Sequence, residues 1–315
     1  MTTSIDTVTR WVGQHAHPLS ASDPEQPLTD LAPLRQLIGP ARVVALGAAT
    51  RDTHELSVTA QRILRFLVEH WGFRSLVLEG DDATSAALDE YVRTGAGDPR
   101  TMLAEAQSFW RTEEILEVVA WLRRYNQRHP DDPVRIAHPE PERRVTAESG
   151  DLGDIEKMLA DNVIRWHEHT GHTIVYWGGT AHTVDAAARD VLLGGQRVTH
   201  RSAGAHLRGH FGSGYLSVGL TFDHGSTAHT FPSPPADFAE AALGRVDLAT
   251  YLLDLRTPAP DSVRTWLTEP TKTRLIGPVY DPENDGAFHL SGGSLSEWFD
   301  LVVHHRTVTS ARPLG

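Results

Sequence analysis

Two side chains that can move a proton near neutral pH stand where predicted strands end. Glu79 closes the apolar run at residues 74–80, and His182 follows the run at residues 173–177. A carboxylate serves as an acid or a base when burial moves its pKa, and an imidazole titrates close to neutrality. We therefore predict that Glu79 and His182 are catalytic. The alternatives are a carboxylate that caps the following helix and a buried histidine satisfied by the backbone.

Three charged or titratable residues follow the first predicted strand, residues 42–47. Arg51 places a permanent cation there, which suits a carboxylate, enolate or phosphate of a ligand. His54 and Glu55 come next, in the first turn of a predicted helix, and both are candidate catalytic residues. Arg51 and Glu55 are also four residues apart, a spacing at which they can form an ion pair along the helix.

Further polar and aromatic residues are expected at the same edge. His138 and Glu140 follow the third predicted strand, while Trp110 and Arg111 precede a predicted helix. For Trp110, packing in the core is the stronger interpretation. The predicted substrate-binding residues are Arg51, Trp110, Arg111, His138, Glu140 and Thr180.

Motifs that would indicate a more specific chemistry are absent from the sequence. It contains no Gly-x-Ser-x-Gly, no P-loop, no Gly-x-Gly-x-x-Gly and no His-Glu-x-x-His. His206 and His210 are four apart, but 18 histidines make such pairs expected by chance. We therefore expect no cofactor and no metal. His304 and His305 end an apolar run and are predicted at the edge of a sheet.

The composition narrows the class of protein further. Of 315 residues, 40% are hydrophobic and 22% are charged, which is typical of a globular protein with a large core. A net charge of −12 argues against a nucleic-acid partner, and the absence of cysteine excludes disulfides and thiolate nucleophiles. No signal-peptide pattern and no long apolar run is present, so we expect a cytoplasmic protein without a membrane partner. The expected partner is a small molecule, and the oligomeric state is unknown.

The hydrophobic patterns that position these residues are those of an α/β protein. The strands at residues 42–47 and 74–80 flank an amphipathic helix at residues 53–71, which makes a βαβ unit with both strand ends at one edge. Further strands are predicted at residues 134–137, 173–177, 216–222 and 301–305, further helices at residues 5–14, 28–38, 83–94 and 115–127, and loops at residues 139–154 and 232–235. We predict one domain over residues 1–315, a mostly parallel sheet with helices on both faces.

Segments along nearly the whole chain resemble the erythromycin esterase family. Residues 43–55 are similar to the family's strand and its Gly-Glu-Ala-Thr-His-Gly-Thr-x-Glu motif, and residues 175–182 to its Trp-Ala-His-Asn-Ala-His motif. Residues 64–79, 110–126, 158–163 and 298–302 are also similar. The resemblance implies the α/β fold of the family, with the family's long helical insertion between the third and fourth strands shortened.

The differences from the family pattern lie at the residues that the family uses for chemistry. Ala48 stands in place of the family's glutamate, Arg51 in place of the histidine thought to activate water, and Asp52 in place of a glycine. Gly179 and Thr180 replace a histidine and an asparagine. Methyl and guanidinium groups cannot accept a proton, so water activation by the family route is not expected. The retained family residues are Glu55, Glu79 and His182.

Three functions follow from this pattern. The first is a natural-product tailoring enzyme that cyclises, isomerises or eliminates from a polyketide-like molecule, with His182 and Glu79 or Glu55 moving protons and Arg51 stabilising negative charge. The second is an esterase or lactone hydrolase with a rebuilt base, for which His54 is the candidate. The third is a non-catalytic binding or resistance protein.

Overall fold

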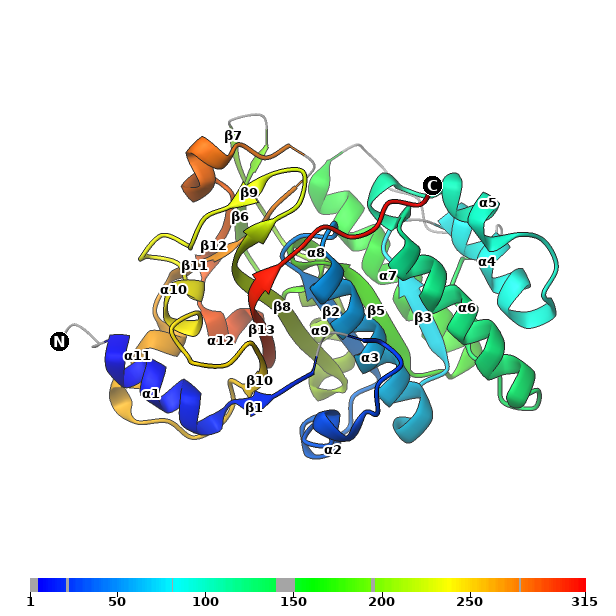
Figure 1. Ribbon diagram of the computed structural model, residues 1–315, viewed down its shortest axis with the longest axis horizontal. Coiled ribbons are helices and arrows are strands. Elements are labelled where there is room, and N and C mark those ends of the chain that lie inside the picture. Colours follow the sequence, from blue (N-terminus) through cyan, green and yellow to red (C-terminus); the bar gives the residue numbers. More distant parts are fainter. Residues whose placement is uncertain (1–4, 21–22, 81, 140–150, 194–195, 278) are drawn as a thin grey trace.

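A nine-stranded sheet forms the centre of the molecule, which the computed structural model describes over residues 5–20, 23–80, 82–139, 151–193, 196–277 and 279–315 (Figure 1). Its strand order is β1-β10-β13-β8-β2-β5-β3-β4, and β9 pairs with β8. The bounds are β1 (His17–Pro18), β2 (Val43–Ala48), β3 (Ser75–Leu78), β4 (Arg135–Ile136), β5 (Ile174–Gly179), β8 (Tyr215–Ser226), β9 (Thr230–Phe231), β10 (Thr250–Asp254) and β13 (Leu301–Val308). The strands from β13 to β4 run parallel, and β1, β10 and β9 are antiparallel to their neighbours, which confirms the predicted mostly parallel sheet.

Helices cover both faces of this sheet (Figure 1). One face is covered by α2 (Leu34–Leu37), α3 (His54–Trp71), α4 (Asp82–Thr94), α5 (Pro99–Ala104) and α6 (Glu113–Arg128). The other face is covered by α7 (Leu152–Thr170) and α9 (Ala203–Phe211), and beside them by α1 (Ile5–His15), α10 (Glu240–Leu243), α11 (Asp261–Thr268) and α12 (Leu295–Trp298). A short helix, α8 (Thr180–Thr183), follows β5 directly.

The central strands are apolar on both sides because both sides are covered. In β2, Val44 and Leu46 pack into the core under α3, while Val43 and Ala45 pack into the core under α7 and α9. All six residues of β2 and of β5 are buried. This is the near-continuous hydrophobic pattern typical of parallel strands. The carboxyl ends of these strands are therefore held in place by a core that is packed on both faces of the sheet.

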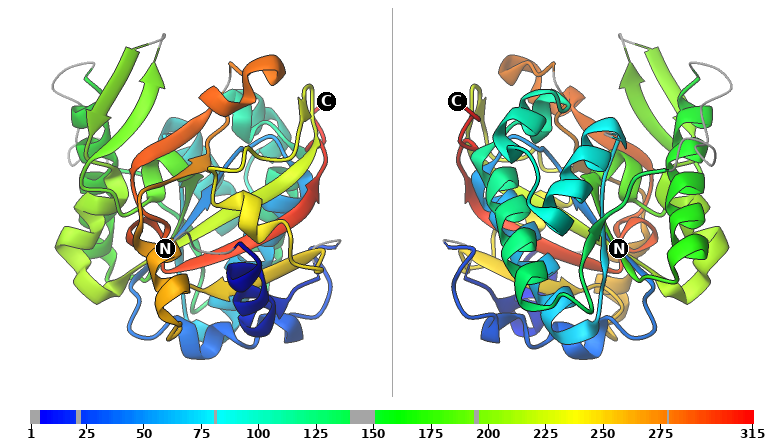
Figure 2. Two further views of the ribbon diagram at one scale, coloured as in Figure 1. Left: turned by 90° about the vertical axis from the view of Figure 1, so that its left-hand side faces the viewer. Right: turned by 90° about the vertical axis from the view of Figure 1, so that its right-hand side faces the viewer.

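A second, four-stranded antiparallel sheet stands beyond those carboxyl ends. Its order is β11 (Thr271–Arg274), β12 (His289–Gly293), β6 (Arg189–Leu193) and β7 (Gln196–His200). Figure 2 shows the β6–β7 hairpin projecting from the same end of the molecule as the 3₁₀ turn Pro282–Ala287. Other 3₁₀ turns are Thr29–Leu31, Ser108–Trp110 and Gly212–Gly214. None of these four strands was predicted from the sequence.

Three sequence predictions need correction. The helix at residues 28–38 is instead a 3₁₀ turn followed by the single turn α2, with Pro33 between them. The loop at residues 139–154 ends earlier, because α7 begins at Leu152 and the Asp151 side chain caps it by accepting from Gly153 N–H; residues 140–150 lie outside the described part of the chain.

The third correction concerns His304 and His305, which were predicted at a sheet edge. Strand β13 has neighbours on both sides, and each of these side chains is 1% exposed. Burial lowers the pKa of both histidines to about 3, so both are neutral. His304 Nδ1 lies 3.0 Å from Thr221 Oγ1, and His305 Nε2 lies 3.1 Å from Thr59 Oγ1.

No helix in the described ranges combines the length and the apolar character that crossing a membrane requires.

Candidate active site

Three neighbouring strands deliver the main polar residues to one edge of the sheet. Arg51 follows β2, Glu79 follows β3, and His182 lies in α8 immediately after β5. Because β3, β5 and β2 are adjacent and parallel, their carboxyl ends meet at the same edge. The backbone N–H of Glu79 donates to Trp177 O at 3.1 Å, which fixes the start of its turn against β5.

Glu79 lies between Arg51 and His182. Its Oε1 is 2.7 Å from Arg51 Nη1 and 3.4 Å from His182 Nε2. Its Oε2 accepts the backbone N–H of Gly179 at 2.7 Å. The structure therefore brings together the two residues predicted as an acid and a base, with the predicted cation beside them.

Glu156 of α7 binds the other ring nitrogen of His182. Glu156 was not predicted as a site residue from the sequence. His182 Nδ1 donates to Glu156 Oε1 at 2.7 Å, and Glu156 Oε2 accepts the backbone N–H of Ala203 at 2.7 Å. The guanidinium of Arg189 also donates to Glu156 Oε1. Burial by itself raises the pKa of this fully enclosed carboxyl, but His182 and Arg189 together hold its pKa well below the usual range.

The carboxylates of Glu79 and Glu156 favour the protonated form of His182. Burial by itself lowers the pKa of His182, but the negative charges of Glu79 and Glu156 outweigh that effect and raise its pKa above the ordinary value. With Nδ1 bound to Glu156, the other ring nitrogen, Nε2, lies 3.4 Å from Glu79 Oε1. The side chain is 19% exposed and lines the cleft described below.

Arg51 occupies a slot between an aromatic ring and a glycine. Its Cζ lies 3.6 Å from the centre of the Phe109 ring, and a Cβ added at Gly179 would come within 3.5 Å of Cζ from the backbone of β5. Trp110 lies farther away, 5.9 Å from ring centre to Cζ, and its Nε1 donates to Glu79 O at 3.1 Å. Trp110 is 2% exposed, so it supports the site from the core.

A cleft of about 700 Å³ opens above these residues. Arg51, Gly179 and His182 line it, together with residues at the end of β2, the first residue of α7, strand β6 and the segment from Leu275 to His289. The apolar side chains of the wall are Leu152, Val191, Leu275, Ile276, Val279, Ala287 and Phe288. A volume of this size accommodates a drug-sized molecule.

Two predicted catalytic residues lie away from this cleft and hold the C-terminal segment. Glu55 accepts Thr309 N–H at 2.6 Å and Thr309 Oγ1 at 2.7 Å, and it does not pair with Arg51, whose described partner is Glu79. His54 Nδ1 lies 2.7 Å from Glu114 Oε1, beside a separate surface hollow. Neither side chain is among the described residues that line the cleft.

The other predicted substrate-binding residues are scattered. Thr180 is buried and donates to Gly47 O at 2.9 Å, and Arg111 is exposed and donates to Ala106 O at 2.6 Å. His138 lies 3.5 Å from Asp89 and lines a small hollow behind Glu79. Glu140 lies outside the described residues.

The sequence does contain a signal for Glu156. The buried residues of α7 are Glu156, Ala160, Val163 and Trp166, so the carboxylate stands on the apolar stripe of an amphipathic helix. A charge in that position needs a partner. Nothing comparable marks Arg189, whose described partner, Glu156, lies in a different element of the fold. Within the described residues, no three His, Asp or Glu side chains form a group suited to a metal ion.

The fold and this edge define an α/β protein with a cluster of a histidine, an arginine and two carboxylates beside a cleft. A family model described as erythromycin esterase matches residues 68–137 and 143–308, and the chain belongs to the erythromycin esterase family.

The similarity extends to individual proteins. The chain is 30% identical over 117 residues to erythromycin esterase type II of Escherichia coli, a match that spans 37% of this chain and 28% of that protein. A solved structure of a succinoglycan biosynthesis protein aligns with a TM-score of 0.78 at 19% identity, covering 99% of each chain. A mutant of the erythromycin esterase EreC in its open conformation aligns with a TM-score of 0.69 at 13% identity, covering 96% of this chain and 99% of that one. At these identities the two structures show a common fold.

Proposed function

We propose that this chain is an enzyme that performs acid-first chemistry on a small molecule bound in the cleft. The observation that carries the proposal is the position of His182, which lies between Glu79 and Glu156, with Nε2 3.4 Å from Glu79 Oε1, and lines the cleft. An imidazolium in this position donates its proton to a substrate oxygen. Arg51 then stabilises negative charge that develops near the same oxygen.

Non-hydrolytic reactions fit this arrangement best. In a cyclisation, His182 Nε2 protonates a carbonyl or epoxide oxygen while a hydroxyl of the same substrate attacks the carbon, and the hydroxyl proton then returns to Nε2. Eliminations and isomerisations use the same single proton carrier. None of them needs activated water, and position 51 carries a guanidinium, which cannot accept a proton. We therefore propose a tailoring role in the modification of polyketide-like compounds.

Glu79 and Glu156 act on the substrate through His182. Glu79 is 5% exposed and is held by Arg51, His182 and the Gly179 N–H, and Glu156 is 0% exposed. Neither carboxylate lines the cleft. Their role is to fix the orientation of the imidazole and to keep its proton in place, which makes them positioning residues.

Ester or lactone hydrolysis is the second candidate, because the chain belongs to the erythromycin esterase family and the Escherichia coli relative carries that name. The base for this reaction would be neutral His182, oriented by Glu156. His54 is a poor candidate for the rebuilt base because its side chain points to Glu114, outside the cleft.

The test compares wild type, His182→Asn and a matched control, His210→Asn, which alters an exposed histidine of α9. Each is incubated with hydroxyketones, epoxy-alcohols, macrolactones and p-nitrophenyl esters, and products are separated by liquid chromatography with mass spectrometry. The proposal predicts isomeric or dehydrated products from wild type and the control, and at least a hundredfold loss with His182→Asn. Full turnover by His182→Asn contradicts it. Binding without conversion of any compound would favour a sequestering protein.

A further inference from the structure

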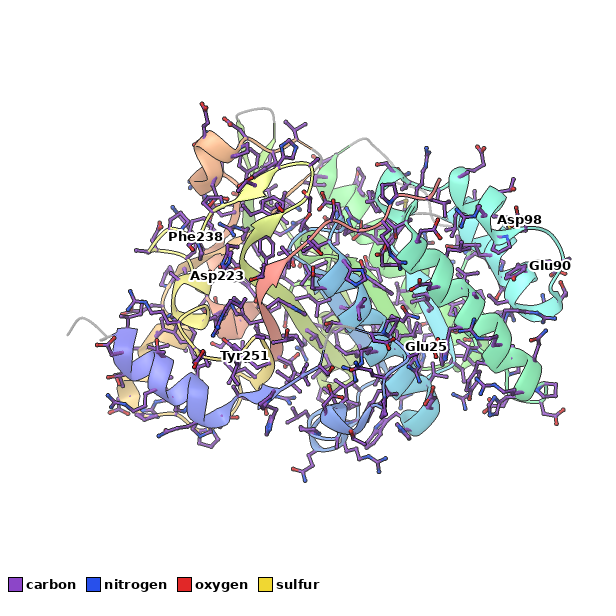
Figure 3. All side chains as sticks on the ribbon, in the orientation of Figure 1. Glu25, Glu90, Asp98, Asp223, Phe238 and Tyr251 are labelled. Carbon is purple, nitrogen blue, oxygen red and sulfur yellow. The ribbon has the colours of Figure 1, made fainter. Side chains whose placement is uncertain are left out.

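The charge of the cleft wall is opposite to that of the whole chain. The chain has a net charge of −12, and exposed carboxylates such as Glu25, Glu90 and Asp98 lie on its outer surface (Figure 3). Among the described residues that line the cleft there is no aspartate or glutamate. The ionisable side chains that do line it are Arg51, His182, Arg189 and His289.

The carboxylates nearest the cleft lie behind its basic side chains. Arg51, Arg189 and His182 line the cleft, and they contact the carboxylates of Glu79 and Glu156, which do not line it. His289 adds no charge, since burial lowers its pKa. An anionic ligand in the cleft is therefore closer to the guanidinium groups of Arg51 and Arg189 than to the carboxylates of Glu79 and Glu156.

Arg51 is the guanidinium that a ligand can reach. Its side chain is 20% exposed, whereas that of Arg189 is 1% exposed and already paired with Glu156. Within the described part of the chain, Arg51 uses Nη1 for Glu79, and its Nε and Nη2 donate no further hydrogen bond. The stack on Phe109 and the approach to Gly179 hold its planar fork in one orientation. Such a fork matches the two oxygens of a carboxylate.

Apart from Thr50 and Asn284, the remaining residues that line the cleft are apolar or glycine. Leu275, Ile276 and Phe288 line the wall that precedes β12, and Val279, 79% exposed, stands at its rim. A ligand that fills the cleft therefore combines one anionic end with an apolar body.

We propose that the cleft selects amphipathic carboxylates, with the carboxylate bound by Arg51 and the apolar body against Leu275, Ile276 and Phe288. This inference rests on the proposed function in one respect, that the ligand is also the substrate. Binding at Arg51 places the carboxylate beside Nε2 of His182, because both side chains contact the same oxygen of Glu79. The reacting bond of the ligand then lies next to its carboxylate group, between that group and the apolar part of the ligand.

Calorimetry with a matched pair of ligands tests the proposal without requiring turnover. The probes are 4-phenylbutyrate and its neutral amide, 4-phenylbutyramide, with phenyl phosphate as a second anion. Wild type should bind the carboxylate about tenfold or more tightly than the amide, since charge-assisted hydrogen bonds are about twice as strong as neutral ones. Arg51→Gln should abolish this preference, and Arg51→Lys should retain part of it.

The control is Arg93→Gln, which removes an exposed arginine of α4 that pairs only with Glu90 among the described ion pairs. It should leave the preference unchanged, and thermal unfolding should show that every variant is folded. Equal binding of carboxylate and amide, an undiminished preference in Arg51→Gln, tighter binding of phenyl phosphate than of the carboxylate, or no saturable binding of the carboxylate would each overturn the proposal. If the preference is found but His182→Asn does not reduce turnover, the binding inference stands and the proposed function fails.

Discussion

Replacing Glu156 by glutamine tests how the proton of His182 is held. The substitution keeps the size of the side chain and removes a carboxylate 2.7 Å from Nδ1. An opposite charge within about 4–6 Å shifts a pKa by about 1–3 units, so the pKa of His182 should fall by about that much in Glu156→Gln. The remaining carboxylate, Glu79, lies 3.4 Å from Nε2 and sustains the rest of the shift.

The same change should also destabilise the fold. The side chain of Arg189 is 1% exposed, and among the described residues it forms its ion pair with Glu156. Removing one member of a buried ion pair costs about 3–5 kcal/mol, because the other charge remains buried without compensation. The double variant Glu156→Gln/Arg189→Met should recover most of this loss, since methionine leaves no charge to compensate.

The sign of the pH dependence follows from the direction of the shift. The folded pKa of His182 lies above its unfolded value, so its contribution to stability is fully present below the unfolded pKa of about 6.5. That contribution is lost as the pH rises through the folded pKa. In Glu156→Gln, whose folded pKa of His182 is lower, this loss should be smaller and should be complete at a lower pH than in wild type.

Two measurements check this prediction. Nitrogen-15 spectra of the histidine rings, with His182 assigned by comparison with His182→Asn, give the pKa directly. Guanidinium chloride unfolding gives the free energy of unfolding. A pKa of His182 that is unchanged by Glu156→Gln, or a loss of stability below about 1 kcal/mol, would refute the reasoning.

Three further predictions concern the surroundings of the site. A Cβ at Gly178 would lie 2.4 Å from Glu79 Oε2, so Gly178→Ala should reduce both turnover and stability, the latter by about 1–3 kcal/mol. The adjacent Gly179→Ala, whose Cβ would make an ordinary contact at 3.5 Å, should change stability by less than about 0.5 kcal/mol in the same unfolding assay. His54→Ala should leave turnover and ligand binding unchanged and lower stability by about 1 kcal/mol or less, whereas a large loss of turnover would return this residue to the mechanism. His304 and His305 have pKa values of about 3, below their unfolded values, so stability should fall as the pH drops below about 6.5, by about 1.4 kcal/mol per pH unit for each; urea midpoints that stay constant from pH 6.5 to 5 would contradict this.

The parallel core of the fold could be predicted because its signals are local. Short apolar runs that end in glycine or a charged residue, separated by amphipathic helices, give β2, α3 and β3 within one or two residues of their observed ends. The right-handed crossover rule then places Arg51 and Glu79 at one edge. The second sheet has no comparable signal. Its strands carry many polar residues, such as Thr271–Arg274 and Gln196–His200, and the pairing of β12 with β6 joins segments that are far apart in the sequence.

The site could be predicted in part for the same reason. Glu79 and His182 are found from their positions at strand ends. Glu55 and His54 lie in the first turn of α3, close to Arg51 in the sequence, but successive side chains of a helix point in different directions: Glu55 faces Thr309 of the C-terminal segment and His54 faces Glu114 of α6. Glu156 reaches the imidazole only because α7 packs against α8 and α9, a contact that sequence spacing does not reveal.

Turnover in water enriched in oxygen-18 shows whether His182 donates a proton to the substrate without activation of water. The account predicts a product with the mass of the substrate, or that mass less one water, with no heavy oxygen incorporated, and no product from His182→Asn. A product that gains one heavy oxygen atom would show that the cleft activates water, and the acid-first assignment would be wrong.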